Sequence, residues 1–259
     1  FFNIIYEVLD FVNDLPLVKF MNGHERIIDY HIWEIEENDT KMARIIQIPL
    51  KLGYAFSIHS SQGCSLDYAE IDLSVISPGI RAAQERGVML SLLHLAIKAL
   101  GNTLPHFPRL ASFHDRSKVY RYRELDVAFA VKAFSGNLYA PVIRAVDQLD
   151  VEQIARACYS AAVEANRGHM ELKDLEGACF TVSHLPLNPI IRFVALPNQF
   201  QSAILAIAAE RQSTKWIDGV ATPAPVAAMT LTYDHTLCDG MYAAEFMQRL
   251  ITEMESALQ

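Results

Sequence analysis

A histidine followed four positions later by an aspartate and a glycine is the pattern in this sequence that best fits catalysis. His235, Asp239 and Gly240 lie between a strand-like run and an amphipathic run. A histidine at the end of a strand can face a cleft, and an imidazole is suited to take a proton near neutral pH. Asp239 can accept hydrogen bonds that order the loop, and Gly240 permits the turn into a helix. The spacing alone is also compatible with a purely structural role for His235 and Asp239.

The same spacing of His235 and Asp239 suits a metal ion bound to one face of a helix. No third ligand is near in the sequence, so we expect no metal. The four cysteines form no C-x-x-C pair and resemble neither a zinc site nor a secreted disulfide framework. They predict a reduced, cytoplasmic protein.

Composition narrows the classes of function. The chain has 259 residues, 51% of them hydrophobic and 20% charged, which is typical of one large globular domain or two small ones. A net charge of -8 argues against general nucleic-acid binding, which needs a basic face. No apolar run reaches the roughly 18 residues of a membrane span, so we expect no membrane segment.

Hydrophobic periodicity predicts strands mixed with long helices, which is an α/β fold. Residues 2–20 have apolar positions at helical spacing, and residues 28–48 read as two strands joined by an acidic turn. The sequence therefore predicts an N-terminal helix and β-ribbon extension over residues 1–52 and a main domain over residues 53–259. Residues 89–100 predict a helix that ends at Gly101. Further predicted helices are 150–166 and 241–258, and further predicted strands are 54–59, 66–73, 127–131, 139–143, 179–183, 203–208 and 225–233.

Several ordered segments resemble one known family. Residues 234–240 resemble the D-H-x-x-x-D-G motif of the catalytic domain of 2-oxo acid dehydrogenase acyltransferases, the E2 components, and of chloramphenicol acetyltransferase. Residues 175–185 resemble the G-x-x-F-T-I-S-N-L segment of E2 chains, and residues 126–144 resemble their strand pair. The order and spacing agree over roughly residues 54–258. The resemblance implies a chloramphenicol acetyltransferase-like two-layer sandwich, a mixed β-sheet with helices on one face.

The family's chemistry assigns roles to particular residues. The resemblance implies that His235 is the general base that takes the proton of an attacking nucleophile. It implies a hydroxyl that donates a hydrogen bond to the oxyanion, from Ser183 first and Thr181 as the reserve; the two share one strand face. Asp239 would organise the loop. His184 and Gly240 are candidates for substrate binding, although His184 either lines the cleft or fills the space of the usual Asn.

The resemblance also implies substrates and partners. Coenzyme A or acyl-CoA, or an acyl-carrier thioester, would be a substrate, a lipoyl group on a partner is possible, and no metal is needed. Family members are homotrimers with active sites between subunits, so the same is expected here. The chain ends without the apolar tail that joins trimers in E2 cores, which favours an isolated trimer over a large cage.

Three departures from the family pattern surround the site. Thr236 replaces the Arg that usually follows the histidine, His184 replaces Asn or Ser, and residues 187–193 replace a glycine-rich loop. They leave two alternatives to the E2 reaction: a non-catalytic trimeric scaffold, or an acyltransferase whose acceptor is a drug or a biosynthetic intermediate. Condensation domains of peptide synthetases also share the histidine motif, but they usually have a second histidine and need two such lobes.

Overall fold

The computed structural model describes residues 5–13, 15–20, 25–37, 40–47, 67–115, 118–217 and 219–258. The chain divides into two compact units, residues 1–57 and residues 58–259. The predicted boundary at residue 52 and the predicted strand 54–59 lie outside the described residues.

The first unit is built from strands. An antiparallel three-stranded sheet contains β1 (Ile5–Val12), β2 (Leu15–Phe20) and β3 (Glu25–Ile27). A separate hairpin pairs β4 (His31–Glu37) with β5 (Thr40–Gln47), which confirms the predicted ribbon.

The predicted N-terminal helix over residues 2–20 is wrong, because that segment forms β1 and β2. The run Ile-Tyr-Glu-Val-Leu-Asp-Phe-Val is rich in β-branched and aromatic residues, which favour strands. Asn13, with a φ of 52°, turns the chain into β2, where Pro16 removes a helical hydrogen-bond donor. The helical spacing arose because six of the eight positions in the run are apolar, so that the run fits a helical period as well as a strand.

A mixed six-stranded sheet forms the centre of the second unit, in the order β12-β9-β13-β14-β15-β6. β13 is parallel to β9 and β14, whereas β15 is antiparallel to β14 and β6. Its strands are β6 (Asp67–Asp72), β9 (Val127–Phe129), β12 (Val142–Ile143), β13 (Phe180–Leu185), β14 (Ala203–Ile217) and β15 (Val220–Tyr233). Two small hairpins are β7 (Ser112–Asp115) with β8 (Lys118–Arg121), and β10 (Val131–Lys132) with β11 (Leu138–Tyr139).

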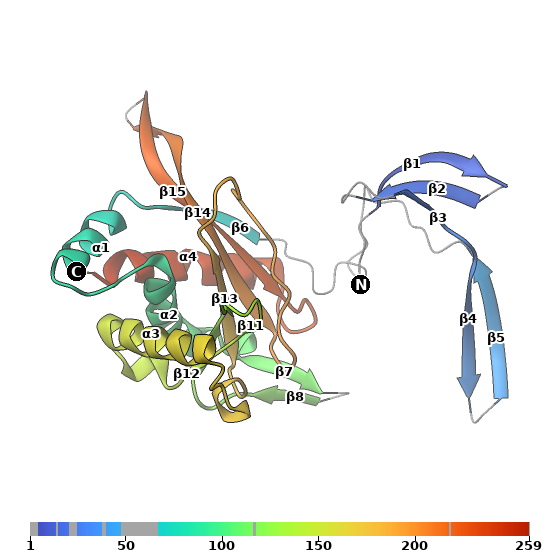
Figure 1. Ribbon diagram of the computed structural model, residues 1–259, viewed down its shortest axis with the longest axis horizontal. Helices are drawn as coiled ribbons and strands as arrows, with labels where there is room; N and C mark the ends of the chain where they lie inside the picture. The colour runs from blue at the N-terminus through green and yellow to red at the C-terminus, as the bar shows by residue number, and fades with distance from the viewer. Residues whose placement is uncertain are drawn as a thin grey trace. The chain divides into compact units, whose positions relative to one another are not determined.

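Four helices cover one face of the sheet, and β14 and β15 extend past it as a long hairpin (Figure 1). The helices are α1 (Ile76–Glu85), α2 (Leu92–Thr103), α3 (Val151–Arg167) and α4 (Gly240–Ser256). Short 3-10 helices are η2 (Leu104–His106), η3 (Pro108–Ala111), η4 (Val146–Gln148) and η5 (Leu172–Asp174). This confirms the predicted mixed sheet with helices.

Alternation along the strands divides the sheet into two faces. Phe180 and Val182 of β13 and Leu231 of β15 join the core beneath the helices. Thr181 and Ser183 therefore point to the opposite face. This parity places the two predicted hydroxyl donors away from the helix layer.

Gly101 lies inside α2 and does not end it, contrary to the predicted cap. A Cβ at this position would lie 2.8 Å from the carbonyl oxygen of Val146 and 2.9 Å from the nitrogen of Asp147. The close approach of η4 to α2 therefore requires a residue without a side chain. The glycine serves packing between elements that are far apart in the sequence.

We expect Gly101→Ala to lower the free energy of unfolding by about 1–3 kcal/mol, because the new methyl group would meet backbone atoms in a packed core. Alanine is the better helix former, so local propensity predicts the opposite sign. Urea unfolding measures the change. Gly79→Ala in α1 is the matched control, because the three atoms nearest to a Cβ there all belong to the side chain of Leu258. A Gly101→Ala chain as stable as the parent would contradict this account.

Candidate active site

The turn that carries His235 is held by hydrogen bonds to both the backbone N–H and the backbone carbonyl of Asp234. The backbone N–H of Asp234 donates to the carbonyl of Ser202 at 2.8 Å, which extends the β14–β15 pairing by one residue. The carbonyl of Asp234 accepts from Leu237 at 3.0 Å and from Cys238 at 3.3 Å. His235 therefore projects from a short turn that leaves little freedom to its backbone.

The ring of His235 packs on the last residue of β15. Its centroid lies 4.8 Å from that of Tyr233, and the two rings are tilted by 46°. The Nε2 atom is buried and has no hydrogen-bond partner among the described residues. Buried polar atoms are usually paired, so an unpaired imidazole nitrogen in a turn is typical of a group that meets a substrate.

Asp239 begins the helix that follows the turn. Its Oδ1 accepts a hydrogen bond from the backbone N–H of Tyr242 at 2.9 Å, which caps α4. Gly240 is the first residue of α4, and a Cβ there would make only an ordinary contact with Tyr233, at 3.7 Å. A substrate contact by Gly240 stays a prediction.

The two predicted hydroxyl donors differ in their surroundings. Thr181 is buried, donates to Oε1 of Gln201 at 2.6 Å and accepts from Nδ2 of Asn198 at 3.0 Å. Ser183 is half-buried, and its hydroxyl makes no hydrogen bond to another described residue. Thr181 thus anchors a loop, whereas the hydroxyl of Ser183 is available for a ligand.

His184 points to the helix side of the sheet, opposite to Ser183, because neighbouring residues on a strand face opposite sides. It lies close enough to His94 of α2 to affect its ionisation. Burial, and then the charge of His184, lower the pKa of His94 to about 4. Burial also lowers the pKa of His184. The structure therefore places His184 beside His94 in the helix layer, and a role in substrate binding stays a prediction.

Within one chain, the structure does not bring Ser183 and His235 together. Ser183 pairs with Ala206, which pairs with Thr230, whereas His235 lies beyond Tyr233. At about 3.3 Å per residue and about 4.8 Å between strands, the end of β15 is roughly 14 Å from Ser183. The side chains of a serine and a histidine are together too short to span this distance.

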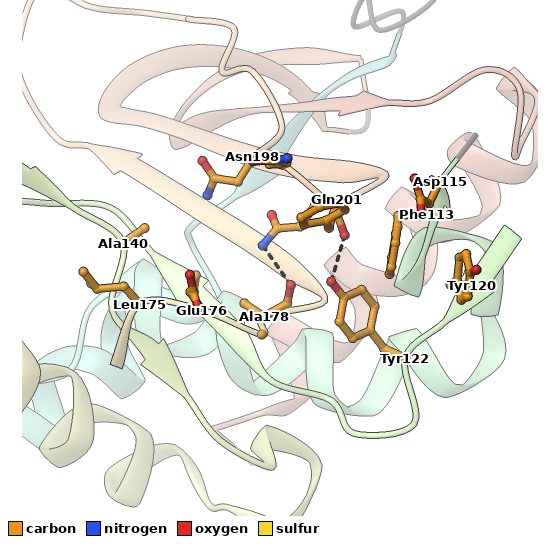
Figure 2. Close-up of a pocket in the computed structure, with 14 residues that line it drawn as sticks. Phe113, Asp115, Tyr120, Tyr122, Ala140, Leu175, Glu176, Ala178, Asn198 and Gln201 are labelled. Carbon is orange, nitrogen blue, oxygen red and sulfur yellow. Dashed lines mark hydrogen bonds between the residues drawn. The ribbon is translucent and has the colours of Figure 1, made fainter. Parts of the chain in front are cut away.

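A cavity of about 790 Å³ is lined by residues of the β7–β8 hairpin and of the segments 175–178 and 198–201 (Figure 2). Phe113 stacks on Tyr120 and meets Phe200 edge to face, and the Tyr122 hydroxyl donates to the Phe200 carbonyl at 2.9 Å. On another side, the Gln201 amide donates to the carbonyl of Ala178 at 3.0 Å. The cavity thus has an aromatic wall and an amide wall, both tethered by hydrogen bonds.

Two neighbours along the chain connect this cavity to His235. Ser202, which binds the backbone of Asp234, directly follows Gln201. His114, which contacts Thr236, lies between the lining residues Phe113 and Asp115. Among the described lining residues, Asp115 and Glu176 are the charged ones. Neither this cavity nor the contact of His114 was predicted from the sequence, in which the aromatic residues of the β7–β8 hairpin were the available signal.

The cysteines near the site are buried. Burial raises the pKa of Cys179 to about 12, and Cys238 is also buried. A thiol in such surroundings is a poor nucleophile. In the part of the chain that the structure describes, no three His, Cys, Asp or Glu side chains gather as metal ligands, and no helix is long and apolar enough to cross a membrane.

Comparison with known proteins agrees with this geometry. Residues 75–259 match the family described as 2-oxoacid dehydrogenases acyltransferase (catalytic domain). The acetyltransferase component of the pyruvate dehydrogenase complex of Azotobacter vinelandii is 30% identical over 222 residues, which are 84% of this chain and 34% of that protein. The chain spans about a third of the length of this relative.

Two solved structures are similar in fold and sequence. One was determined to examine a serine, a histidine and an asparagine in the catalytic mechanism of the dihydrolipoamide acetyltransferase of Azotobacter vinelandii; it has a TM-score of 0.68, 26% identity, and coverage of 74% of this chain and 83% of that chain. The other is the cubic core of the pyruvate dehydrogenase multienzyme complex, with a TM-score of 0.68, 27% identity and the same coverage. This chain belongs to the family of 2-oxoacid dehydrogenase acyltransferase catalytic domains, and the resemblance found in the sequence is confirmed.

We expect the stability of the wild-type chain to fall as the pH drops from 6.5 towards 4. His94 has a pKa of about 4 in the folded chain against an ordinary 6.5, so the unfolded chain binds more protons over that range. His94→Gln should flatten this pH dependence, because Gln keeps an acceptor for the Ser91 N–H but does not titrate. Urea unfolding at several pH values tests it, and equal slopes for both chains would refute it.

Proposed function

We propose that this chain transfers an acyl group between a coenzyme A or carrier thioester and an acceptor thiol, hydroxyl or amine. His235 is the general base, and Ser183 of a neighbouring copy donates to the oxyanion. The observation that carries this proposal is the buried, unpaired Nε2 of His235 in a turn held from both sides. Membership in a family of acyltransferase catalytic domains supports it.

Spacing along the chain supports the choice of Ser183 and Asp239. In the Azotobacter vinelandii structure, the histidine follows the serine by 52 positions and the asparagine follows the histidine by 4. In this chain, His235 follows Ser183 by 52 positions, and Asp239 follows His235 by 4. Thr181 does not fit this spacing, and its hydroxyl is already bonded to Gln201. We therefore assign the oxyanion donor to Ser183.

The assembly follows from the separation of these residues. One chain holds Ser183 and the end of β15 roughly 14 Å apart, so a complete site needs His235 from one copy and Ser183 from the next. We propose a homotrimer with three such sites, because a ring of identical contacts completes every site. The similarity to a cubic multienzyme core supports an assembly of this kind.

The reaction proceeds in two steps, addition to the thioester and loss of the original thiol. Nε2 of His235 takes the proton of the acceptor thiol as its sulfur attacks the thioester carbonyl carbon, and the carbonyl oxygen becomes an oxyanion bound by the Ser183 hydroxyl. The tetrahedral intermediate then expels the original thiolate, which takes the proton back from His235. An acceptor hydroxyl or amine would react in the same way. Equivalent steps in reverse return the acyl group.

The names of the relatives suggest the physiological pair of substrates. They are acyltransferases of dihydrolipoyllysine residues, so we propose coenzyme A and a lipoyl group on a partner chain as the two substrates. Arg109 and Arg121 supply cations near the start of α4 for the phosphates of coenzyme A. The guanidinium carbon of Arg109 lies 5.2 Å from the centre of the Tyr242 ring. Burial raises the pKa of Tyr242, and the charges of Arg109 and Arg121 oppose that rise.

The cavity lined by the β7–β8 hairpin and residues 198–201 suits the acyl acceptor better than coenzyme A. Its volume of about 790 Å³ fits a small molecule, and its aromatic wall suits an apolar body. Asp115 and Glu176 would repel phosphates. We propose that the acceptor binds in this cavity and that an acceptor without a negative charge is preferred. The scaffold alternative is not favoured, since neither the family nor the geometry of the turn supports it.

Complementation between two inactive variants tests the shared site. His235→Ala should lower kcat by about 10²- to 10⁴-fold, and Ser183→Ala by about 10²- to 10³-fold. Mixing the two variants, unfolding them and refolding them together should restore about a quarter of the sites, because each site takes one residue from each copy. Acetyl transfer from acetyl-CoA to dihydrolipoamide is the assay.

Each variant refolded alone is the control, together with a sedimentation measurement that shows trimers in every sample. A mixture no more active than the separate variants would exclude a shared site. A His235→Ala chain with the turnover of the parent would exclude the proposed base.

Acceptors that differ in charge test whether the acceptor binds in the cavity. Dihydrolipoate carries a carboxylate that dihydrolipoamide lacks, so we expect a kcat/KM about tenfold lower for dihydrolipoate. The double variant Asp115→Asn, Glu176→Gln should bring the two values together and leave the KM for acetyl-CoA unchanged. An unaltered ratio would place the acceptor elsewhere.

A further inference from the structure

Thr236, which replaces the usual Arg after the histidine, connects two segments that are distant in the sequence. Its Oγ1 lies 2.7 Å from Oδ1 of Asp234 and 2.8 Å from Nδ1 of His114. His114 comes from β7, 122 positions earlier in the chain, and its Nδ1 also lies 3.5 Å from Oδ2 of Asp234. The residue before His235 and the residue after it are thus held by one side chain from another strand.

The direction of each hydrogen bond follows from the available protons. The carboxylate of Asp234 only accepts, and its Oδ1 already accepts from the backbone N–H of Thr236 at 2.8 Å. The single hydroxyl proton of Thr236 therefore goes to Asp234, and the Thr236 oxygen accepts from His114. This requires a proton on Nδ1 of His114, which both the imidazolium and one neutral tautomer supply.

This network controls the part of the turn that the backbone leaves free. The backbone N–H and carbonyl of Asp234 are bound to Ser202 and to Leu237, but they do not determine where the Asp234 carboxylate points. The carboxylate takes its direction from Thr236 and His114. Between these contacts lies His235, whose ring must meet a substrate within a fraction of an ångström to act as a base.

We propose that His114 is a positioning residue, which acts through Thr236 and Asp234 to hold the turn so that His235 faces the reacting atoms. This inference rests on the proposed function of His235. His114 itself touches neither substrate nor the reacting bond. Its removal should therefore reduce kcat and leave the binding of both substrates nearly unchanged.

Paired substitutions separate the hydrogen bond from the shape of the side chain. His114→Phe keeps a ring and removes the donor, and Thr236→Val keeps the shape and removes the hydroxyl. We expect each to lower kcat about tenfold while both KM values change less than about twofold. His114→Asn, whose amide nitrogen can take the place of Nδ1, and Thr236→Ser should retain at least about half of the activity.

A double-mutant cycle tests whether the two residues act together. Because both variants break the same chain of hydrogen bonds, His114→Phe with Thr236→Val should be no slower than the slower single variant. His169→Phe is the control for a lost imidazole, since His169 is exposed and its Nδ1 lies 3.3 Å from Oε2 of Glu164, away from the turn. Losses that multiply in the double variant would overturn the proposal.

The outcomes distinguish this inference from the proposed function. If the parent chain and His235→Ala are equally inactive, the proposed function fails. If His235→Ala is inactive while His114→Phe and Thr236→Val turn over like the parent, only this inference fails. A readout without activity is the NMR signal of the His235 Cε1–H, which should shift in folded His114→Phe and return in His114→Asn; an unmoved signal would also overturn the proposal.

Discussion

The pairing of β14 with β15 determines where His235 lies. After a register shift between Ile207 and Glu210, the two strands pair continuously from Ile207 and Met229 to Ala203 and Tyr233, and the bond from Asp234 to Ser202 continues the ladder by one residue. Asp239 then caps α4 five residues later. Both ends of the turn are therefore anchored in regular structure, so the turn cannot relax without breaking a ladder bond or a helix cap.

The same sheet keeps Ser183, the proposed oxyanion donor, away from His235, the proposed base. β13 and β15 are separated by β14, and the alternation of side chains sends Ser183 to the face without helices. A rigid sheet can carry both groups but cannot bring them together in one copy. This gives a physical reason for an enzyme of this fold to assemble, because a second copy can place its own serine beside the histidine of the first.

The departures from the family pattern have different structural meanings. At Thr236, a loss of charge is accompanied by a hydrogen-bonded partner from β7, so the turn has another means of support. At His184, the changed side chain lies under the helices beside His94 and is not on the face of Ser183. Two neighbouring residues on one strand thus belong to different parts of the protein, and a departure near a site in the sequence need not be near it in space.

Local signals in the sequence were enough to identify the helix predicted over residues 150–166, the central strands and the histidine turn. Caps, β-branched runs and the spacing of His235 and Asp239 are set by residues close together in the chain. They failed at residues 2–20, where the apolar residues are frequent enough to fit both a helical and a strand period, and at Gly101, whose role depends on Val146. Only tertiary structure decided that His114 contacts Thr236, that Thr181 is already bonded and that Ser183 lies far from His235, because contacts across a sheet depend on strand order and register, which no local pattern encodes.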